Sequence, residues 1–127
     1  MNVPSPAMEA FAGEFLKKYG GNSHQGWWYL RMKNELDMFA QALNTTKSAE
    51  PLKVAKVLSD MKYKNILGAE IYMRPADHQL FQDMYLSSFG SGTKHDEEGT
   101  GWGWKTTALI KAADTVIPTT CKMKVPG

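Results

Sequence analysis

Apolar residues recur every three or four positions through the first half of the chain, a spacing that predicts amphipathic helices. The first helix is expected from Pro6 to Tyr19, because proline suits the first helical position and the following Gly20-Gly21 pair can close a helix. Ser5 stands where a capping hydroxyl would accept a backbone N–H. The apolar positions are Met8, Phe11, Ala12, Phe15, Leu16 and Tyr19. We therefore expect one face of this helix to pack against the rest of the protein.

Two further helices are predicted before the middle of the chain. A polar loop over 22–26 is expected to lead into a helix over 27–43. After a polar break at 44–47, Ser48 can cap a third helix that tolerates Pro51 in its first turn. The apolar stripe of the second helix is Trp28, Met32, Leu36, Phe39 and Leu43, and that of the third is Leu52, Ala55, Leu58 and Met61.

From residue 69 onward the apolar spacing shortens to two, which predicts β-strands. Residues 69–74 alternate as a strand with one buried face, and 80–89 are expected to form a second strand. The connection over 75–77 is not a tight two-residue hairpin turn. Residues 90–101 are glycine-rich and acidic, which predicts a solvated loop. The stretch 104–113 is ambiguous, because its threonines favour a strand and its alanines favour a helix.

Composition narrows the class of protein only moderately. The 127 residues are 43% apolar and 22% charged, with a net charge of +2. This balance is ordinary for one globular domain, and the charge is too small to indicate nucleic acid or a membrane surface as a partner. Cys121 is the only cysteine, which excludes an intramolecular disulfide. The first residues lack the basic and apolar regions of a signal peptide, so we expect export to require additional sequence upstream.

The residues that could carry chemistry are scattered. His24, His78 and His95 lie in separate segments without the spacing of zinc ligands, and no nucleophile motif occurs. We therefore predict no metal, no cofactor and no catalytic residue. Asp77 is interpreted as a turn or capping carboxylate, and His78 as a hydrogen-bonded structural residue. The stretch 99–103 resembles part of a phosphate-binding loop, but it lacks the Lys-Ser/Thr pair and is expected to be a flexible loop.

Three consecutive aromatic residues, Trp27, Trp28 and Tyr29, mark the expected start of the second helix. They could pack into the core, since Trp28 has the spacing of the apolar stripe, or they could form an aromatic wall facing a ligand cleft. Arg31 and Lys33 follow, and a spacing of two places them about 200° apart around a helix, so both cannot share a face with Trp27.

Several short motifs, taken with their order along the chain, resemble one protein family. They are K-Y-G at 18–20, A-Q-A-L at 40–43, R-P-A-D-H-Q at 74–79 and P-T-T-C-K-M-K-V-P at 118–126. In this order they resemble the C-terminal end of the branched-chain amino-acid-type substrate-binding proteins of ABC transporters, the type 1 periplasmic binding protein family. The resemblance covers nearly the whole chain, and the D-H-Q segment and the tail are its most specific parts.

The resemblance implies an α/β fold in which three helices precede the β-strands, with residues 1–127 as a single C-terminal segment of a two-lobe solute-binding domain. It favours a strand over 104–113. It implies a small amino acid, amide or related ligand in the interlobe cleft, and neither enzymatic activity nor a metal. For the full-length protein it implies ABC permease subunits as partners and a periplasmic or other extracytoplasmic location. The isolated segment is expected to self-associate through helix faces that a larger sheet would cover.

The same resemblance directs attention to the start of the second helix as part of the ligand site. The best candidates there are Trp27, Trp28, Tyr29 and Arg31. Lys33 stands where many relatives carry a tyrosine, which makes an anionic ligand group a plausible alternative to the usual leucine, isoleucine or valine. A different class of function also fits the sequence, namely a free-standing, small, non-catalytic interaction or regulatory domain.

Overall fold

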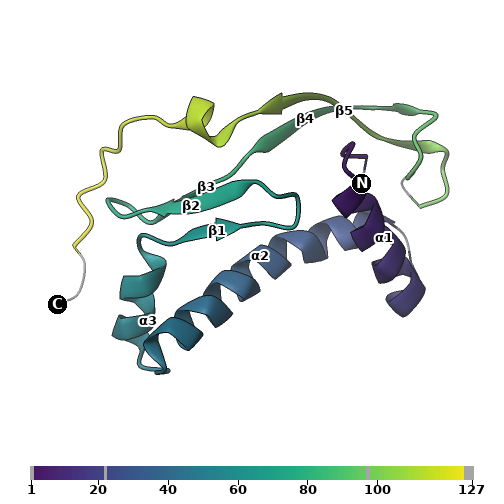
Figure 1. Ribbon diagram of the computed structural model, residues 1–127. Helices are drawn as coiled ribbons and strands as arrows, with labels where there is room; N and C mark the ends of the chain where they lie inside the picture. The colour runs from purple at the N-terminus through teal and green to yellow at the C-terminus, as the bar shows by residue number, and fades with distance from the viewer. Residues whose placement is uncertain (1, 22, 97, 125–127) are drawn as a thin grey trace. The chain divides into compact units, whose positions relative to one another are not determined.

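The computed structural model describes residues 2–21, 23–96 and 98–124, without the side chains of 23–28 and 31 (Figure 1). The chain divides into two compact units, each made of two separate stretches. Unit 1 comprises Met1–Lys33 and Met84–Ile110, and unit 2 comprises Asn34–Asp83 and Lys111–Gly127.

Helix α1 of unit 1, Pro6–Tyr19, has the predicted bounds. Gly20 closes the helix with a φ of 68°, and its N–H donates to the Leu16 carbonyl. A positive φ of this kind favours glycine, which explains why the Gly20-Gly21 pair correctly predicted the end of the helix. Ser5 occupies the N-cap position, but its side chain makes no capping hydrogen bond, so that part of the prediction is wrong. Met8 and Ala12 supply the buried face.

Helix α2, Ser23–Thr46, begins in unit 1 and ends in unit 2. It is longer than predicted at both ends: residues 23–26 of the expected loop are helical, while Asn22 lies outside the described residues. At the C-terminal end the Thr46 hydroxyl donates to the Ala42 carbonyl at 3.0 Å, which satisfies a group of the last turn.

Most of the apolar stripe predicted for α2 lies on an exposed face of the helix, so this prediction is largely wrong. Met32, Leu36 and Phe39 are about half exposed or more, whereas the buried residues of the described part are Leu30, Met38 and Ala42. The buried set recurs at spacings of four and eight, so the covered face is rotated away from the expected stripe. Of the remaining two predicted positions, Leu43 packs against the core of unit 2, and the Trp28 side chain lies outside the described residues.

Helix α3, Pro51–Leu58, is shorter than expected and has a different cap. The Glu50 carboxylate accepts the Leu52 N–H at 3.0 Å, while Ser48 accepts the Glu50 N–H instead of capping the helix. The expected face is also only partly right, since Leu52 and Ala55 are exposed and Val54 is buried.

The sheet of unit 2 has three antiparallel strands in chain order: β1 Lys62–Lys64, β2 Glu70–Arg74 and β3 Gln79–Phe81. Strand β2 was predicted, and β1 was not, because a strand of three residues with lysine at both ends has almost no apolar pattern. Residues 75–78 join β2 to β3, which confirms the longer connection. Fully buried Ile71 lies at the centre of a core that includes Met38, Ala42, Val54 and Met61.

Unit 1 contains a two-stranded antiparallel ribbon, β4 Met84–Ser91 and β5 Trp102–Ile110. The single strand predicted over 80–89 is therefore wrong, because β3 ends at Phe81 and the chain enters a different sheet at Met84. The strand choice over 104–113 is confirmed as far as Ile110, and a short 3-10 helix, η1 Ala112–Thr115, follows. The α/β class, with three helices before the strands, is confirmed.

Candidate functional site

The predicted ligand-binding residues lie in the first turns of α2. The side chains of Trp27, Trp28 and Arg31 lie outside the described residues, although the backbone at these positions is helical. Tyr29 is described, and 55% of its surface is exposed. Its ring lies 5.1 Å from the ring of Phe15 on α1. Tyr29 therefore has one side against an aromatic neighbour, and about half of its surface is open.

The ribbon of unit 1 carries apolar side chains on both of its faces. On one face the ring of Phe89 lies 6.0 Å from that of Trp102 and 5.2 Å from that of Trp104. All three residues are 50% exposed. Met84 and Leu86, which alternate onto the opposite face, are exposed too. The ribbon therefore exposes large apolar side chains on both faces.

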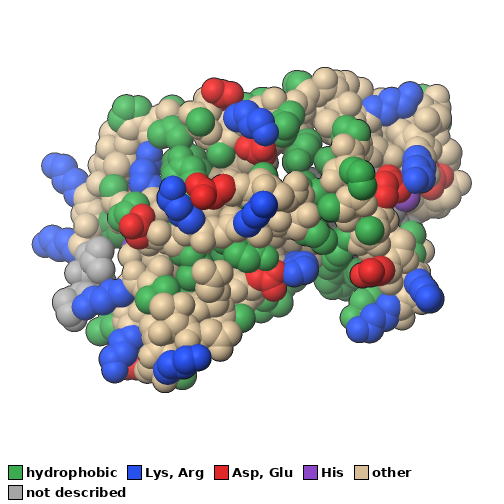
Figure 2. Space-filling model, viewed as in Figure 1, with side chains coloured by type: hydrophobic (Ala, Val, Ile, Leu, Met, Phe, Trp, Pro, Cys, Tyr) green, Lys and Arg blue, Asp and Glu red, His purple; other side chains and the backbone are tan. Residues whose placement is uncertain are grey.

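Charged side chains of both signs are spread over the visible surface. Figure 2 shows Lys and Arg side chains interspersed with Asp and Glu, rather than gathered into one patch on that face. Within the described part of the chain, no group of His, Cys, Asp and Glu side chains is arranged to hold a metal ion. Among the same residues, no helix combines the length and the apolar character that crossing a membrane requires.

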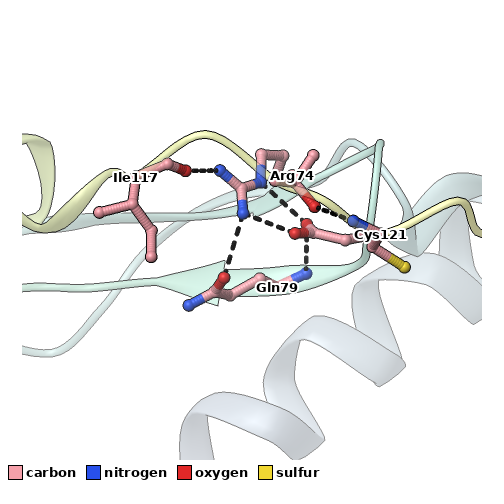
Figure 3. Close-up of polar contacts among 6 residues, drawn as sticks. Arg74, Gln79, Ile117 and Cys121 are labelled. Atoms are coloured by element: carbon pink, nitrogen blue, oxygen red, sulfur yellow. Dashed lines mark hydrogen bonds and ion pairs between the residues drawn. The ribbon is translucent and has the colours of Figure 1, made fainter.

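Asp77 and Gln79 of the D-H-Q segment bind the guanidinium group of Arg74 (Figure 3). Arg74 donates from Nε to Asp77 Oδ1 at 2.9 Å and from Nη2 to Asp77 Oδ2 at 2.5 Å. Its Nη2 also donates to Gln79 Oε1 at 3.1 Å, and its Nη1 donates to the Ile117 carbonyl at 2.7 Å. Four of the five guanidinium N–H donors are thus used inside unit 2. Arg74 consequently fastens the tail to the β2–β3 turn.

Electrostatics at this turn fit a structural role. The Arg74 hydrogen bonds hold the pKa of the Asp77 carboxyl well below its usual range, against a smaller opposing effect of burial. Hydrogen bonds from Thr119 and from the Gln79 N–H act in the same direction as Arg74. The interpretation of Asp77 as a turn carboxylate is confirmed. His78 is held through its backbone N–H, which donates to the Arg74 carbonyl at 2.8 Å, while its side chain is exposed.

A second polar cluster in unit 1 was not expected from the sequence. Glu9 on α1 accepts from Lys94 Nζ at 2.6 Å and lies 3.1 Å from His95 Nε2. The hydrogen bonds from these two side chains lower the pKa of the Glu9 carboxyl. Asn2 bonds the backbone of His95 from both sides, donating to its carbonyl at 2.8 Å and accepting its N–H at 3.0 Å. These contacts fix the loop after β4, and their long sequence separation leaves no local pattern to predict them.

Comparison with protein families identifies the class to which this arrangement belongs. A family model described as periplasmic binding protein matches residues 2–94, which is well over half of the chain. The chain belongs to this family.

The fold comparison agrees with the family. The crystal structure of the leucine-, isoleucine-, valine-, threonine- and alanine-binding protein from Brucella ovis, in a closed conformation, matches with a TM-score of 0.71 and 22% sequence identity. The match covers 95% of this chain and 32% of that protein, so the chain spans about a third of its length. No curated protein matches the sequence. The predicted resemblance is confirmed: the fold is part of a type 1 periplasmic binding protein.

Proposed function

We propose that this chain forms the C-terminal part of the extracytoplasmic solute-binding subunit of an ABC importer. The receptor binds a small amino acid, amide or related ligand in the cleft between two lobes and presents it to the permease subunits. It binds its ligand without transforming it. The observation that carries the proposal is the family match over residues 2–94. The name of the structurally similar Brucella ovis protein, which lists five amino acids, supports the same ligand class.

Within that receptor, the start of α2 supplies part of the ligand site. Trp27, Trp28 and Tyr29 are the aromatic candidates, and Arg31 pairs with a carboxylate of the ligand. A spacing of two places Tyr29 about 200° around the helix from both Trp27 and Arg31, so the three cannot all face one ligand. The alternative of a free-standing interaction domain is less favoured, since the family match accounts for most of the chain.

Calorimetric titration of a full-length receptor that contains this segment tests the proposal. The ligands would be leucine, alanine, glutamate and acetamide, which separate apolar, anionic and amide recognition. We expect at least one to bind, and we expect Arg31→Ala to weaken binding of a carboxylate ligand by roughly 1.5–3 kcal/mol, the range for hydrogen bonds to charged groups. Lys53→Ala, at an exposed position on α3, is the matched control.

Two results would contradict the proposal at different levels. If Arg31→Ala binds as tightly as the wild type, Arg31 does not belong to the site and the argument for an anionic ligand group fails. If the intact receptor binds none of the four compounds, the proposed apolar, anionic and amide recognition fails for these representatives.

A further inference from the structure

Strand β4 has one edge without a neighbouring strand, since β4 and β5 alone form the sheet of unit 1 in the described part of the chain. In an antiparallel pair, consecutive residues turn their backbone N–H and C=O groups alternately toward the other strand and away from it. Gly92, just after β4, donates its N–H to the Gly101 carbonyl at 3.3 Å and therefore faces β5. The register continues without a shift from Ser91 back to Ser87. The backbone groups of Ser87, Phe89 and Ser91 consequently point away from β5.

The outer edge of β4 lacks the usual protection of an edge strand. Among the described residues, no backbone hydrogen bond from another segment reaches Ser87, Phe89 or Ser91, and none of the three is buried. Natural proteins protect exposed edges with charged residues, proline or bulges. Strand β1 follows this rule, with lysine at both of its ends. Strand β4, Met84–Ser91, carries neither a charged residue nor a proline. Its outer edge is therefore open to another strand.

The outer edge of β5 is better protected. It contains a bulge at Thr107, the residue that the register skips. The Trp102 N–H, which the same alternation directs outward, already donates to Thr100 Oγ1 at 3.3 Å. Lys105 adds a charge within the strand. Because each of these features discourages an added strand, β4 is the edge of the ribbon that a further strand would use.

We propose that a second copy of this chain pairs antiparallel with β4, which joins the two ribbons into a four-stranded sheet about a two-fold axis. A two-fold pair sets a strand against itself, so a charge near its centre would meet the same charge, and β4 has none. The register that uses all three outward residues is centred on Phe89 and pairs Ser87 of each copy with Ser91 of the other. It places the two Phe89 rings next to each other, so that the exposed rings of Phe89, Trp102 and Trp104 continue across the joint.

Charges introduced at positions 87 and 91 test this register. In the double-lysine variant, Ser87→Lys with Ser91→Lys, like charges face each other across the axis. In the lysine–glutamate variant, Ser87→Lys with Ser91→Glu, each lysine faces a glutamate. Sedimentation equilibrium of the 127-residue chain at about 0.15 M salt measures the dimer dissociation constant while distant charges are screened. We expect the double-lysine variant to weaken the dimer about tenfold, the effect of two like-charge cross-strand pairs, and the lysine–glutamate variant to associate about as well as the wild type.

The matched control, Gln41→Lys with Thr45→Lys, adds the same charge at exposed positions of α2 and should leave the dissociation constant unchanged. None of these variants alters the ring cluster, so weaker association cannot be due to lost apolar surface. A lysine–glutamate variant that associates as weakly as the double-lysine variant overturns the proposal. A wild-type chain that stays monomeric at every concentration also overturns it, and would leave this edge to a strand of a longer receptor.

Hydrogen exchange of the wild type is an independent measurement that needs no folded variant. The amides of Phe89 and Ser91 should exchange slowly only at concentrations at which the dimer forms. Those of Ser88 and Gly90, which face β5, should exchange slowly at all concentrations. Outward amides that stay fast in the associated chain overturn the proposal, because association then uses another surface. Neither experiment involves a ligand, so its outcome is independent of whether the receptor binds amino acids.

Discussion

Several single side chains in this molecule join segments by binding backbone or charged partners, some of which are distant in sequence. Arg74 is the most connected example, since it bonds a turn residue, a strand residue and the tail, and its guanidinium also lies 4.8 Å from the Phe81 ring. Because those donors are occupied, we expect the D-H-Q segment to be structural and ligand contacts to lie elsewhere.

Loss of the Asp77 carboxylate should release the tail. In Asp77→Ala, Arg74 loses its bidentate partner, and we expect a lower thermal midpoint and faster hydrogen exchange over 117–121. Asp77→Asn should show a smaller effect, because it keeps one acceptor. Asp60→Ala, at an exposed position after α3, is the control. If hydrogen exchange over 117–121 is unchanged in Asp77→Ala, Arg74 holds the tail without help from the Asp77 carboxylate.

Tyr63 should make stability depend on alkaline pH. Its hydroxyl donates to Asp37 Oδ2 at 2.6 Å, and burial together with this bond raises the pKa of Tyr63 to about 12. The unfolded chain ionises near pH 10, so the protonated phenol stabilises the fold fully below that pH. We expect the free energy of unfolding to fall as the pH rises from about 10 to 12.

Denaturant titrations of the wild type and of Tyr63→Phe across this range check the prediction. The variant should be about 1 kcal/mol less stable at neutral pH, because it lacks the hydrogen bond. Its loss of stability at alkaline pH should be smaller than that of the wild type, since only the other titrating groups contribute. Identical pH profiles would show that Tyr63 does not titrate in the native state as expected.

Among the elements, the β4–β5 ribbon depends on a glycine. A Cβ atom at Gly103 would lie 2.5 Å from Thr93 Oγ1 and 2.6 Å from the His95 carbonyl oxygen, both closer than real Cβ atoms approach. The loop that Asn2 and Glu9 fasten therefore packs directly against β5 at this point.

Two glycine-to-alanine variants should shift stability in opposite directions. Gly103→Ala should cost about 1–3 kcal/mol through overpacking. Gly13→Ala should gain about 0.5–1 kcal/mol, because Gly13 lies inside α1 and no neighbouring atom lies within 4 Å of the added methyl group. Denaturant unfolding of both variants measures the difference, and a Gly103→Ala protein as stable as the wild type would mean that the loop moves aside freely.

The sequence predicted those elements that local signals delimit. Pro6 and Gly20-Gly21 bound α1, and alternation marks β2. The break between β3 and β4 was missed, and at this break the Asp83 carboxylate accepts the N–H of Ala112, a contact 29 residues apart that no local pattern reveals. The covered face of α2 was also misassigned, since apolar residues that lack a partner in this chain follow the same spacing as buried ones. For the ligand site, a pattern can indicate aromatic residues at a helix start, but not which of them face a cleft.

At the scale of the molecule, many large apolar side chains of the described residues are exposed. Leu36 and Phe39 of α2 are about half exposed or more. So are the three aromatic residues of the ribbon, Phe89, Trp102 and Trp104. Exposed patches of this kind promote association.

We therefore expect the isolated chain to self-associate or to bind a dye that recognises apolar surface. Light scattering should show a mass that rises with concentration, and the double variant Phe89→Ser, Trp104→Ser should reduce it. Tyr19→Ser, which alters an exposed aromatic on α1, is the control. A monomer that melts cooperatively and binds no dye would contradict this expectation.

The division of the chain into alternating stretches has a consequence for its biosynthesis. Translation delivers the first part of unit 1, then most of unit 2, and only afterwards the ribbon that completes unit 1. The three-stranded sheet of unit 2, which ends at Phe81, can pair while the ribbon is still unmade. The ribbon of unit 1 is complete only when residue 110 has been added. Because each unit consists of two separate stretches, no single proteolytic cut can separate them. For the same reason, no uninterrupted piece of the gene encodes either unit alone.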